Sequence, residues 1–377
     1  MISFWEKDAL LEYDYIVVGS GILGLSTAIE IKERKPEASI IILERGLLPT
    51  GASTKNAGFA CFAKACEMLS DIKLQGEAKT AELAHERYEG LVKLRERVGD
   101  QAMDFRQLGG YELILDQDTE VKQESLDYLN SLLAPHFKQD VFEFKNELID
   151  AFGFGRTKQL IHNPLEGQIH SGRLIDTLWT KAGHLGIKVI TGAEVLEVME
   201  SANGTELEVF HASLGEYVLF KGQKVVLCTN ALAKSVFGDE TIEPGRGQVL
   251  VSEEIPSLRF QGTFHFDEGY YYFRNYGNRI LFGGGRNLDK ETENTGDFTF
   301  NWKIQEKLNS YLSEVILPNE KTDIAMRWTG IMGFSTSKTP FTKKLNSSLY
   351  QGFTCNGMGI ALGSQTAAEL ADLVLNN

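Results

Sequence analysis

The feature that most constrains the fold is a glycine-rich turn near the start of the chain, Gly19-Ser20-Gly21-Ile22-Leu23-Gly24. A short apolar strand, Tyr15 to Val18, leads into this turn, and apolar residues at helical spacing follow it to about Arg34. A second apolar strand then ends at Glu44, twenty positions after the last glycine of the turn. Strand, G-x-G-x-x-G turn, helix and acid-terminated strand together predict a dinucleotide-binding unit.

Each part of this pattern has a physical reason. Gly19 permits the tight turn, Gly21 lets the backbone approach a pyrophosphate, and Gly24 lets the helix pack close to the strand. The start of the helix offers unpaired N–H groups and a partial positive charge to the phosphates. The Glu44 carboxylate can accept hydrogen bonds from ribose hydroxyls and would repel a 2′-phosphate. The predicted dinucleotide contacts are therefore Gly19, Ser20, Gly21, Ile22, Gly24 and Glu44.

A second run of small residues distinguishes between two dinucleotides. Gly51-Ala52-Ser53 leads through Asn56-Ala57-Gly58-Phe59 to a predicted helix start, soon after Glu44-Arg45. An NAD domain does not need a second backbone-lined site at this place. FAD is longer and its flavin end must be held beyond the pyrophosphate, so this run favours FAD.

Composition limits the partners. The 377 residues correspond to roughly two domains at about 150 residues each. Lys and Arg number 38 against 52 Asp and Glu, a net charge of −14 that disfavours nucleic acid. No apolar run approaches the ~18 residues of a membrane span, and the first residues do not resemble a secretory signal. The four cysteines form no C-x-x-C pair, so we expect free thiols, no metal site and a cytoplasmic protein.

The remaining pattern alternates helices and strands. Helix is predicted from about Phe59 to Val98, several strands between Gly245 and Gly285, and a final strand, glycine turn and helix from Leu349 to about Leu375. The expected fold class is mixed, α/β plus α+β: a Rossmann-like FAD-binding domain with an inserted antiparallel-sheet substrate domain. The expected FAD-binding domain is discontinuous, over residues 1–85, 150–240 and 325–377, and the substrate domain covers 86–149 and 241–324.

With these motifs in place, nearly the whole sequence resembles the superfamily of D-amino-acid oxidase, glycine oxidase and sarcosine oxidase, the DAO family, with some likeness to γ-glutamylputrescine oxidase. The segments that carry the resemblance are Glu44-Arg45, Gly51-Ala52-Ser53, Gln168 to Gly172, the strand at Val195, Val226 to Asn230, Trp328-Thr329-Gly330 and Gly352 to Gly359. The resemblance implies further FAD contacts at Arg45, Gly51, Ala52, Ser53, Asn56, Ala57, Gly58, Phe59, Val195, Thr229, Asn230, Gly330, Asn356, Gly357, Met358, Gly359 and Ile360. In it, Val195 contacts adenine, and the turn from Asn356 to Ile360 lies against the flavin.

The resemblance also implies a chemistry. FAD would take a hydride equivalent from a C–H next to an amine nitrogen, and the imine would then hydrolyse. The substrate would be a small amine or amino acid. The expected pocket residues are Tyr272, Arg274 and Arg246. On a strand, Tyr270, Tyr272 and Arg274 share one face, where an Arg beside Tyr hydroxyls could clamp a carboxylate. The alternative is an aromatic stripe that packs the domain core with Arg274 at its edge.

Three further residues stay open between a pocket role and a structural one: Lys55, His170 and His265.

Departures from the resemblance narrow the expectation. Positions where relatives carry carboxylate-binding Arg hold Met332 and Cys355, and the position of a sarcosine-oxidase Lys holds Gly359. An oxygen-activating Lys would fall about at Leu281, and residues 334–340 contain no cysteine that could tether the flavin. We therefore expect non-covalent FAD and a substrate other than glycine or sarcosine. The electron acceptor stays unknown.

Two other functions stay open. One is oxidation of a hydroxy acid or similar alcohol, which would require a base, typically His, beside the substrate hydroxyl. The other is a non-catalytic or tRNA-modifying flavoprotein, and the acidic surface weighs against RNA.

Overall fold

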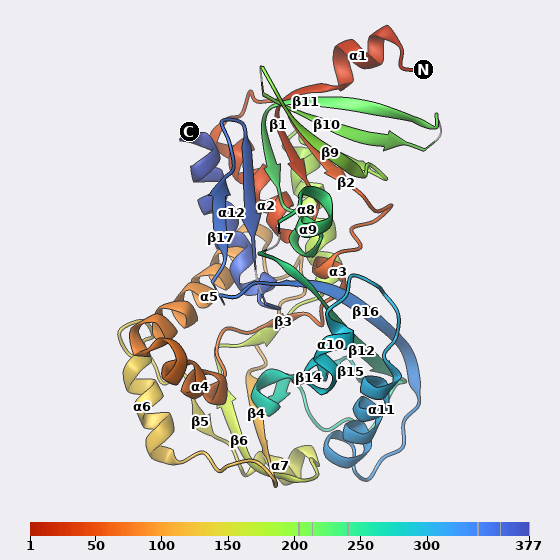
Figure 1. Cartoon of the computed structure of the whole chain (residues 1–377). Coiled ribbons are helices and arrows are strands. Elements are labelled where there is room, and N and C mark those ends of the chain that lie inside the picture. Colours follow the sequence, from red (N-terminus) through yellow and green to blue (C-terminus); the bar gives the residue numbers. More distant parts are fainter. Residues whose placement is uncertain (203, 213, 240, 338, 355, 377) are drawn as a thin grey trace.

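The computed structural model describes residues 1–202, 204–212, 214–239, 241–337, 339–354 and 356–376 (Figure 1). One sheet carries the predicted dinucleotide unit, and its strands come from the start, middle and end of the chain. They are β1 (Glu12–Val18), β2 (Ile40–Glu44), β8 (Lys188–Thr191), β9 (Val195–Ser201), β10 (Gly204–His211), β11 (Glu216–Leu227), β17 (Phe341–Lys344) and β18 (Leu349–Phe353). The order is β17-β18-β11-β1-β2-β8, and β10 and β9 extend from β11 as antiparallel strands.

The centre of this first sheet is parallel. β1 pairs in parallel with β11 and β2, β2 with β8, and β11 with β18. All five residues of β2 are buried, as expected for a parallel strand covered on both faces.

Helices cover this sheet and the second sheet described below, and they connect the strands of both. They are α1 (Phe4–Leu10), α2 (Ile22–Arg34), α3 (Ala52–Lys55), α4 (Ala65–Gln75), α5 (Glu77–Val98), α6 (Gln123–Leu133), α7 (Leu148–Phe152), α8 (Ser171–His184), α9 (Ala233–Phe237), α10 (Lys290–Glu293), α11 (Trp302–Tyr311) and α12 (Gly359–Leu375). The C-terminal α12 packs against α2 and α5. Gly90 of α5 is needed there, because a Cβ at that position would lie 1.9 Å from the Ala361 carbonyl oxygen. None of the helices in the described ranges is long and apolar enough to cross a membrane.

A second, largely antiparallel sheet lies below the first in Figure 1. Its strands are β4 (Gly110–Leu115), β5 (Glu143–Phe144), β6 (Thr157–Asn163), β12 (Glu243–Ser252), β13 (Thr263–Phe266), β14 (Tyr271–Tyr276), β15 (Arg279–Gly284) and β16 (Ile324–Phe334). Their order is β16-β12-β15-β14-β13-β4-β6-β5. One face packs a buried aromatic core that includes Phe264, Phe273 and Phe282, with α11 against it. The predicted combination of a Rossmann-like part and an antiparallel-sheet part is confirmed.

The predicted helix from about Phe59 to Val98 is interrupted. Its first residues form β3 (Phe59–Ala60), which pairs with β7 (Gly167–Gln168), and helix begins only at Ala65. A break at Gly76, where φ is +89°, separates α4 from α5. The break at Gly76 arises because only glycine adopts this backbone conformation readily. The strand at β3 could not be predicted locally, because its partner β7 lies far away in the sequence.

Sheet membership departs from the predicted domain boundaries at two strands. The prediction assigns residues 157–163 and 325–334 to the FAD-binding domain, but β6 and β16 pair within the second sheet. We therefore propose that the substrate domain includes both strands. The reason is that a strand belongs to the body that supplies its hydrogen-bonding partners.

Candidate active site

The glycine turn has the close contacts that the fingerprint requires. Gly19 has φ +102°, and a Cβ there would lie 2.8 Å from the Cys228 carbonyl oxygen. A Cβ at Gly24 would lie 1.9 Å from the Gly19 carbonyl oxygen, so helix α2 could not sit this close to β1. The glycines are therefore explained by the geometry of the turn.

Gly24 supports a direct prediction. We expect Gly24→Ala to push α2 away from the turn, to destabilise the fold by about 1–3 kcal/mol through overpacking, and to abolish the yellow colour of bound flavin. Gly183→Ala is the matched control, because Gly183 lies in helix α8 with no atom within 4 Å of a new Cβ. Flavin absorbance and thermal unfolding of both purified variants measure this, and a yellow Gly24→Ala protein would contradict it.

The Glu44 carboxylate is held ready at the end of β2. Its Oε2 accepts hydrogen bonds from the Ser20 backbone N–H and hydroxyl at 2.9 and 2.8 Å, and its Oε1 accepts one from the Gly46 N–H at 2.9 Å. A carboxylate oxygen has two lone pairs, so Oε1 keeps one acceptor position for a ribose hydroxyl. The Ile22 N–H at the start of α2 donates to the Ser53 hydroxyl at 3.0 Å, which ties the two predicted cofactor segments together.

Polar atoms without partners lie where the pyrophosphate is expected. Thr229 Oγ1 and Asn230 Oδ1 are buried and have no hydrogen-bond partner among the described residues. Both residues directly follow β11, beside the glycine turn, and Asn230 has φ +47°. Buried polar groups in folded proteins are normally paired, so these atoms fit a polar ligand such as FAD. Val195, the expected adenine contact, is buried at the start of β9.

The expected flavin end is built around Asn56 and α3. The Asn56 amide donates to the carbonyl oxygens of Ala52 and Ser53, and its Oδ1 accepts from the Gly58 N–H and the Ser171 hydroxyl. The indole of Trp328 donates to the Lys55 carbonyl oxygen at 2.9 Å, which joins α3 to the second sheet. Gly330 permits this approach, since a Cβ there would lie 2.7 Å from the Lys55 Cβ.

The C-terminal turn faces the same space. Asn356 has φ +56°, donates from its backbone to the Gly333 carbonyl and accepts from the Ser335 N–H. Among the described residues, a Cβ at Gly357 would meet only Met332 Sδ, at 3.8 Å. Met358 caps α12, which begins with Gly359 and the buried Ile360. Cys355 lies outside the described residues.

On one face of the second sheet, two glycines leave room for the Tyr272 side chain; we call this the hollowed face. Gly247 of β12 and Gly283 of β15 lie beside the Tyr272 hydroxyl, which is 3.9 and 3.0 Å from the Cβ positions they lack. Tyr271 and Phe273 point to the opposite face and pack the aromatic core, as expected for alternation along β14. Tyr270, which was expected on the face of Tyr272, lies before β14 and is exposed. Burial raises the pKa of Tyr272 to about 12, so its hydroxyl stays neutral and can donate a hydrogen bond.

Arg274 lies next to Tyr272 on this hollowed face. It is 5% exposed, and its guanidinium donates no hydrogen bond within the described part of the chain; its Nε is fully buried without a partner. A Cβ at Gly58 would lie 3.1 Å from Arg274 Nη2, so the missing side chain leaves room for the guanidinium. Burial lowers the pKa of Arg274 to about 10, which still leaves it charged at neutral pH.

Arg246 has a different environment from the one predicted. Its guanidinium is fully engaged, since it donates to both Glu293 carboxylate oxygens, to the Thr299 hydroxyl, and to the carbonyls of Thr292 and Asp297. The Arg246–Glu293 ion pair is 2.7 Å long and buried. No N–H remains for a substrate, so we replace the predicted pocket role with a structural one. The physical reason is Glu293, a partner that lies 47 positions away in the sequence.

Lys55, His170 and His265, which the sequence left between a pocket role and a structural role, have different surroundings. His170 caps α8 by accepting from the Arg173 N–H, a structural role. Lys55 holds its ammonium 5.8 Å from the Phe298 ring centre. His265 is buried on the hollowed face, pairs with Tyr272 across β13 and β14, and has no partner for either ring nitrogen among the described residues. Its ring meets the Phe59 ring edge-on at 5.0 Å, and Phe59 meets Tyr272 at 5.5 Å.

Sequence reasoning missed two buried acids beside His265. Glu112 lies opposite it on β4, and Glu166 lies in the turn before β7. The only available signal for Glu112 was an acid inside an apolar strand; Glu166 had none. Among the described residues, no group of His, Cys, Asp and Glu is arranged to hold a metal ion.

The fold and this site define a dinucleotide-binding oxidoreductase with a separate substrate sheet. The family comparison is specific: the chain belongs to the DAO family of FAD-dependent oxidoreductases, whose model matches residues 14–373. It is therefore an FAD-dependent enzyme, as predicted.

Individual relatives match nearly the whole length of this chain. The probable oxidoreductase OrdL of Haemophilus influenzae is 22% identical over 97% of this chain and 83% of its own length. Glycine oxidase from Geobacillus kaustophilus has a similar structure with a TM-score of 0.72 and 20% identity, covering 97% of this chain and 95% of that one. L-proline dehydrogenase from P. horikoshii gives a TM-score of 0.73 and 16% identity, over 97% and 94%. At these identities the structural likeness shows the fold alone.

Proposed function

We propose that this protein oxidises a CH–NH bond of a small amine that carries a carboxylate. The observation that carries the proposal is the buried side chain of Arg274, whose Nε is fully buried and whose guanidinium has no hydrogen-bond or ion-pair partner among the described residues. A buried charge without a partner is costly, so a site that retains one is suited to an anion. A carboxylate matches the planar fork of an arginine and would lie beside the Tyr272 hydroxyl.

The roles of the chain's own residues follow from this placement. Arg274 binds and orients the carboxylate, Tyr272 donates a neutral hydrogen bond, and Phe59 excludes water from the same face. FAD, when bound, would supply the electron acceptor: a hydride equivalent would leave the carbon for the flavin, and the nitrogen lone pair would form the C=N bond of a protonated imine. Addition of water to this protonated imine would then give the carbonyl compound and release ammonium or a protonated amine. We assign no catalytic base, since an amine bound in its neutral form needs none.

The names of the structural relatives support an amino-acid-like substrate. They include a glycine oxidase, an L-amino acid deaminase from Proteus vulgaris and an iminodiacetate oxidase from Chelativorans. The compounds in these three names all contain a C–N bond next to a carboxylate.

The test is anaerobic flavin bleaching across a panel of D- and L-amino acids, N-alkyl amino acids, simple amines and hydroxy acids. We expect rapid bleaching by at least one amine that carries a carboxylate, and slow or no bleaching by amines without one. Bleaching by simple amines alone would contradict the proposal, as would a flavin that no amine reduces.

His265 favours one alternative within this panel. Burial lowers its pKa, so the imidazole is neutral and could accept a proton from an alcohol beside Tyr272. Oxidation of a hydroxy acid is therefore the second candidate. Bleaching by hydroxy acids with amines inert would select it, and a flavin that no member of the panel reduces would select the non-catalytic alternative.

We further propose that FAD is bound non-covalently and that neither glycine nor sarcosine is the natural substrate. Acid precipitation should release all yellow colour from the protein, and steady-state assays should show poor turnover of both compounds. We also place the protein in the cytoplasm, supported by the free thiols of Cys61, Cys66 and Cys228. The electron acceptor is left open, and stopped-flow reoxidation by air would separate an oxidase from a dehydrogenase.

A further inference from the structure

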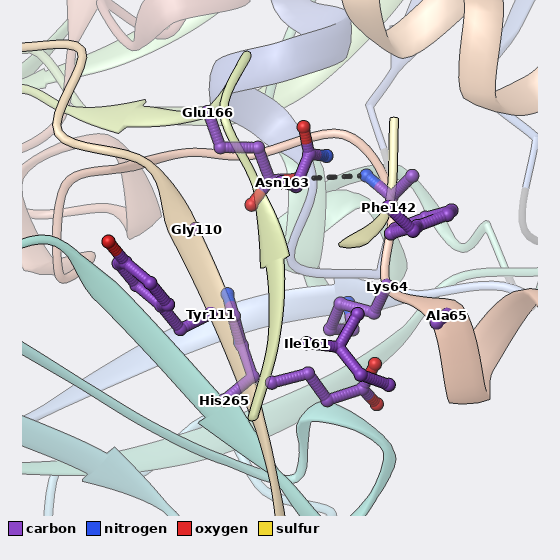
Figure 2. A pocket seen from close by; sticks show the side chains of 11 residues that line it. Lys64, Ala65, Gly110, Tyr111, Phe142, Ile161, Asn163, Glu166 and His265 are labelled. Carbon is purple, nitrogen blue, oxygen red and sulfur yellow. Dashed lines mark hydrogen bonds between the residues drawn. The ribbon is translucent and has the colours of Figure 1, made fainter. Parts of the chain in front are cut away.

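A small cavity lies beside the candidate substrate site, since His265, one of its lining residues, pairs with Tyr272 across β13 and β14 (Figure 2 shows the lining). Its charged and amide lining consists of Lys64, Glu112, Asn163, Glu166 and His265, from four separate segments of the chain. About 10 Å³ is open to the centre of a water molecule, which is room for one ordered water. The function proposed above uses none of these groups except, in its alternative, His265.

Several atoms in this lining lack partners. Glu112 Oε1, Asn163 Nδ2 and both ring nitrogens of His265 are buried and have no hydrogen bond among the described residues. The three residues are between 3% and 5% exposed, so bulk water does not satisfy them. Each unpaired buried polar group costs ~1–3 kcal/mol, so one shared ligand that satisfies several of them is favoured.

The polarity of these atoms selects the ligand. Asn163 Oδ1 accepts from the Leu165 N–H, so the amide orientation is fixed and Nδ2 must donate. Glu112 Oε1 and a neutral imidazole nitrogen accept. Water can accept two hydrogen bonds and donate two. It can accept from Asn163 Nδ2 and donate to Glu112 Oε1 and the unprotonated ring nitrogen of His265, which leaves one lone pair for a protonated Glu166. An ammonium or metal cation cannot accept from Asn163 and would leave its Nδ2 unpaired.

Glu166 adds a titratable group beside this water site. Its Oε1 accepts from the backbone N–H groups of Phe62 and Ala63 at 2.8 and 3.0 Å, and the residue is 1% exposed. Burial is the main cause that raises the pKa of Glu166 to about 7, and it also raises the pKa of Glu112. Burial lowers the pKa of His265, which therefore stays neutral.

Charged and titratable side chains surround this group of buried acids. Lys64 pairs with Glu67 at 2.6 Å, and Arg87 of α5 lies 3.7 Å from the same carboxylate. Cys66 donates its backbone N–H to Glu112 Oε2, and burial raises its thiol pKa, as it does for Cys61. The two cations are thus shared with Glu67 and do not neutralise Glu112 and Glu166 alone.

We propose that this cavity binds one ordered water that links Glu166, Glu112 and His265, and that Glu166 takes up a proton there to form a proton store beside the substrate site. In the uptake step a proton from solvent forms an O–H bond at the Glu166 carboxylate, and no electrons move. Proton uptake by Glu166 does not depend on the proposed function. The statement that the proton store lies beside the substrate rests on that function.

The experiment measures urea unfolding of the FAD-saturated protein, without substrate, between pH 4.5 and 8. The pKa of Glu166 is raised on folding from its ordinary value of 4.5 to about 7, so the folded state holds a proton that the unfolded state releases. Stability from this group is present below pH 4.5 and is lost as the pH rises toward 7. Relative to Glu166→Gln, the wild type should therefore lose stability across this window and run parallel above it.

Glu166→Gln is the matched variant, since its amide oxygen keeps both backbone contacts. Glu254→Gln on the surface is the control and should leave the wild-type curve shape unchanged. Glu112→Gln provides a second variant if the first does not fold. It removes a like charge that raises the pKa of Glu166, so the loss should move to lower pH. Parallel curves for wild type and Glu166→Gln would overturn the proton store.

A high-resolution crystal structure tests the water separately. One water within hydrogen-bond distance of Glu112 Oε1 and Asn163 Nδ2 is expected. An empty cavity or a bound cation would overturn the water site.

Discussion

Replacement of Arg274 by methionine should lower kcat/KM for the best carboxylate-bearing amine by roughly 10²- to 10³-fold and leave the matching decarboxylated amine almost unaffected. The reason is that removing one partner of a buried charge pair costs about 2–5 kcal/mol. Methionine keeps the apolar stem of the side chain and removes the guanidinium, with its charge and its hydrogen-bond donors. The preference for a carboxylate, expressed as the ratio of the two kcat/KM values, is the measured quantity.

The same substitution should stabilise the substrate-free protein. The side chain is 5% exposed and its guanidinium has no partner in the described ranges, so its removal relieves a desolvation cost, and the free energy of unfolding should rise. A gain in stability together with a loss of substrate discrimination identifies a binding group and not a structural one. Arg279→Met is the control on the neighbouring strand, where the guanidinium pairs with Glu253 at the surface. Equal losses for both substrates would show that Arg274 does not bind the carboxylate.

The second large effect concerns the Arg246–Glu293 pair. Glu293 is completely buried and also accepts from the side-chain amides of Gln248 and Asn301. Glu293→Ala would leave the Arg246 charge buried and uncompensated, so the free energy of unfolding should fall by about 3–5 kcal/mol. Chemical denaturation followed by tryptophan fluorescence measures the loss.

A double variant separates the charge from the packing. Arg246→Met combined with Glu293→Leu removes both charges and should recover most of the stability, because an apolar pair of similar volume often replaces a buried ion pair without loss. If the double variant keeps carboxylate discrimination, Arg246 has the structural role that its contacts indicate. Loss of discrimination in a well-folded double variant would return Arg246 to the substrate site.

The local parts of the fold could be predicted from the sequence. The turn from Gly19 to Gly24 and the acid Glu44 lie within one βαβ unit, where spacing alone sets the geometry. The alternation of Tyr271, Tyr272 and Phe273 follows from the two-residue period of a strand. Both depend on neighbours in the sequence.

The missed parts depend on distant partners. The sequence predicts a pocket role for Arg246, because its partner Glu293 lies far away in the chain. It predicts helix at Phe59, because the strand partner Gln168 is also distant in the chain. The cluster of Glu112, Glu166 and His265 is assembled by strand pairing and by a turn from another part of the chain. No local pattern marks such contacts, because they are set by tertiary packing.

The order of strands in the first sheet has a consequence for biosynthesis. β1, near the start of the chain, needs β11 as its neighbour, β11 needs β18, and α2 packs against the C-terminal α12. The dinucleotide turn is thus translated long before β18 and α12, which support it. Because such distant contacts form late, we expect the nascent chain to hold its cofactor stably only after α12 has been translated. Incomplete chains that stop before β18 should therefore emerge colourless and exposed to proteolysis.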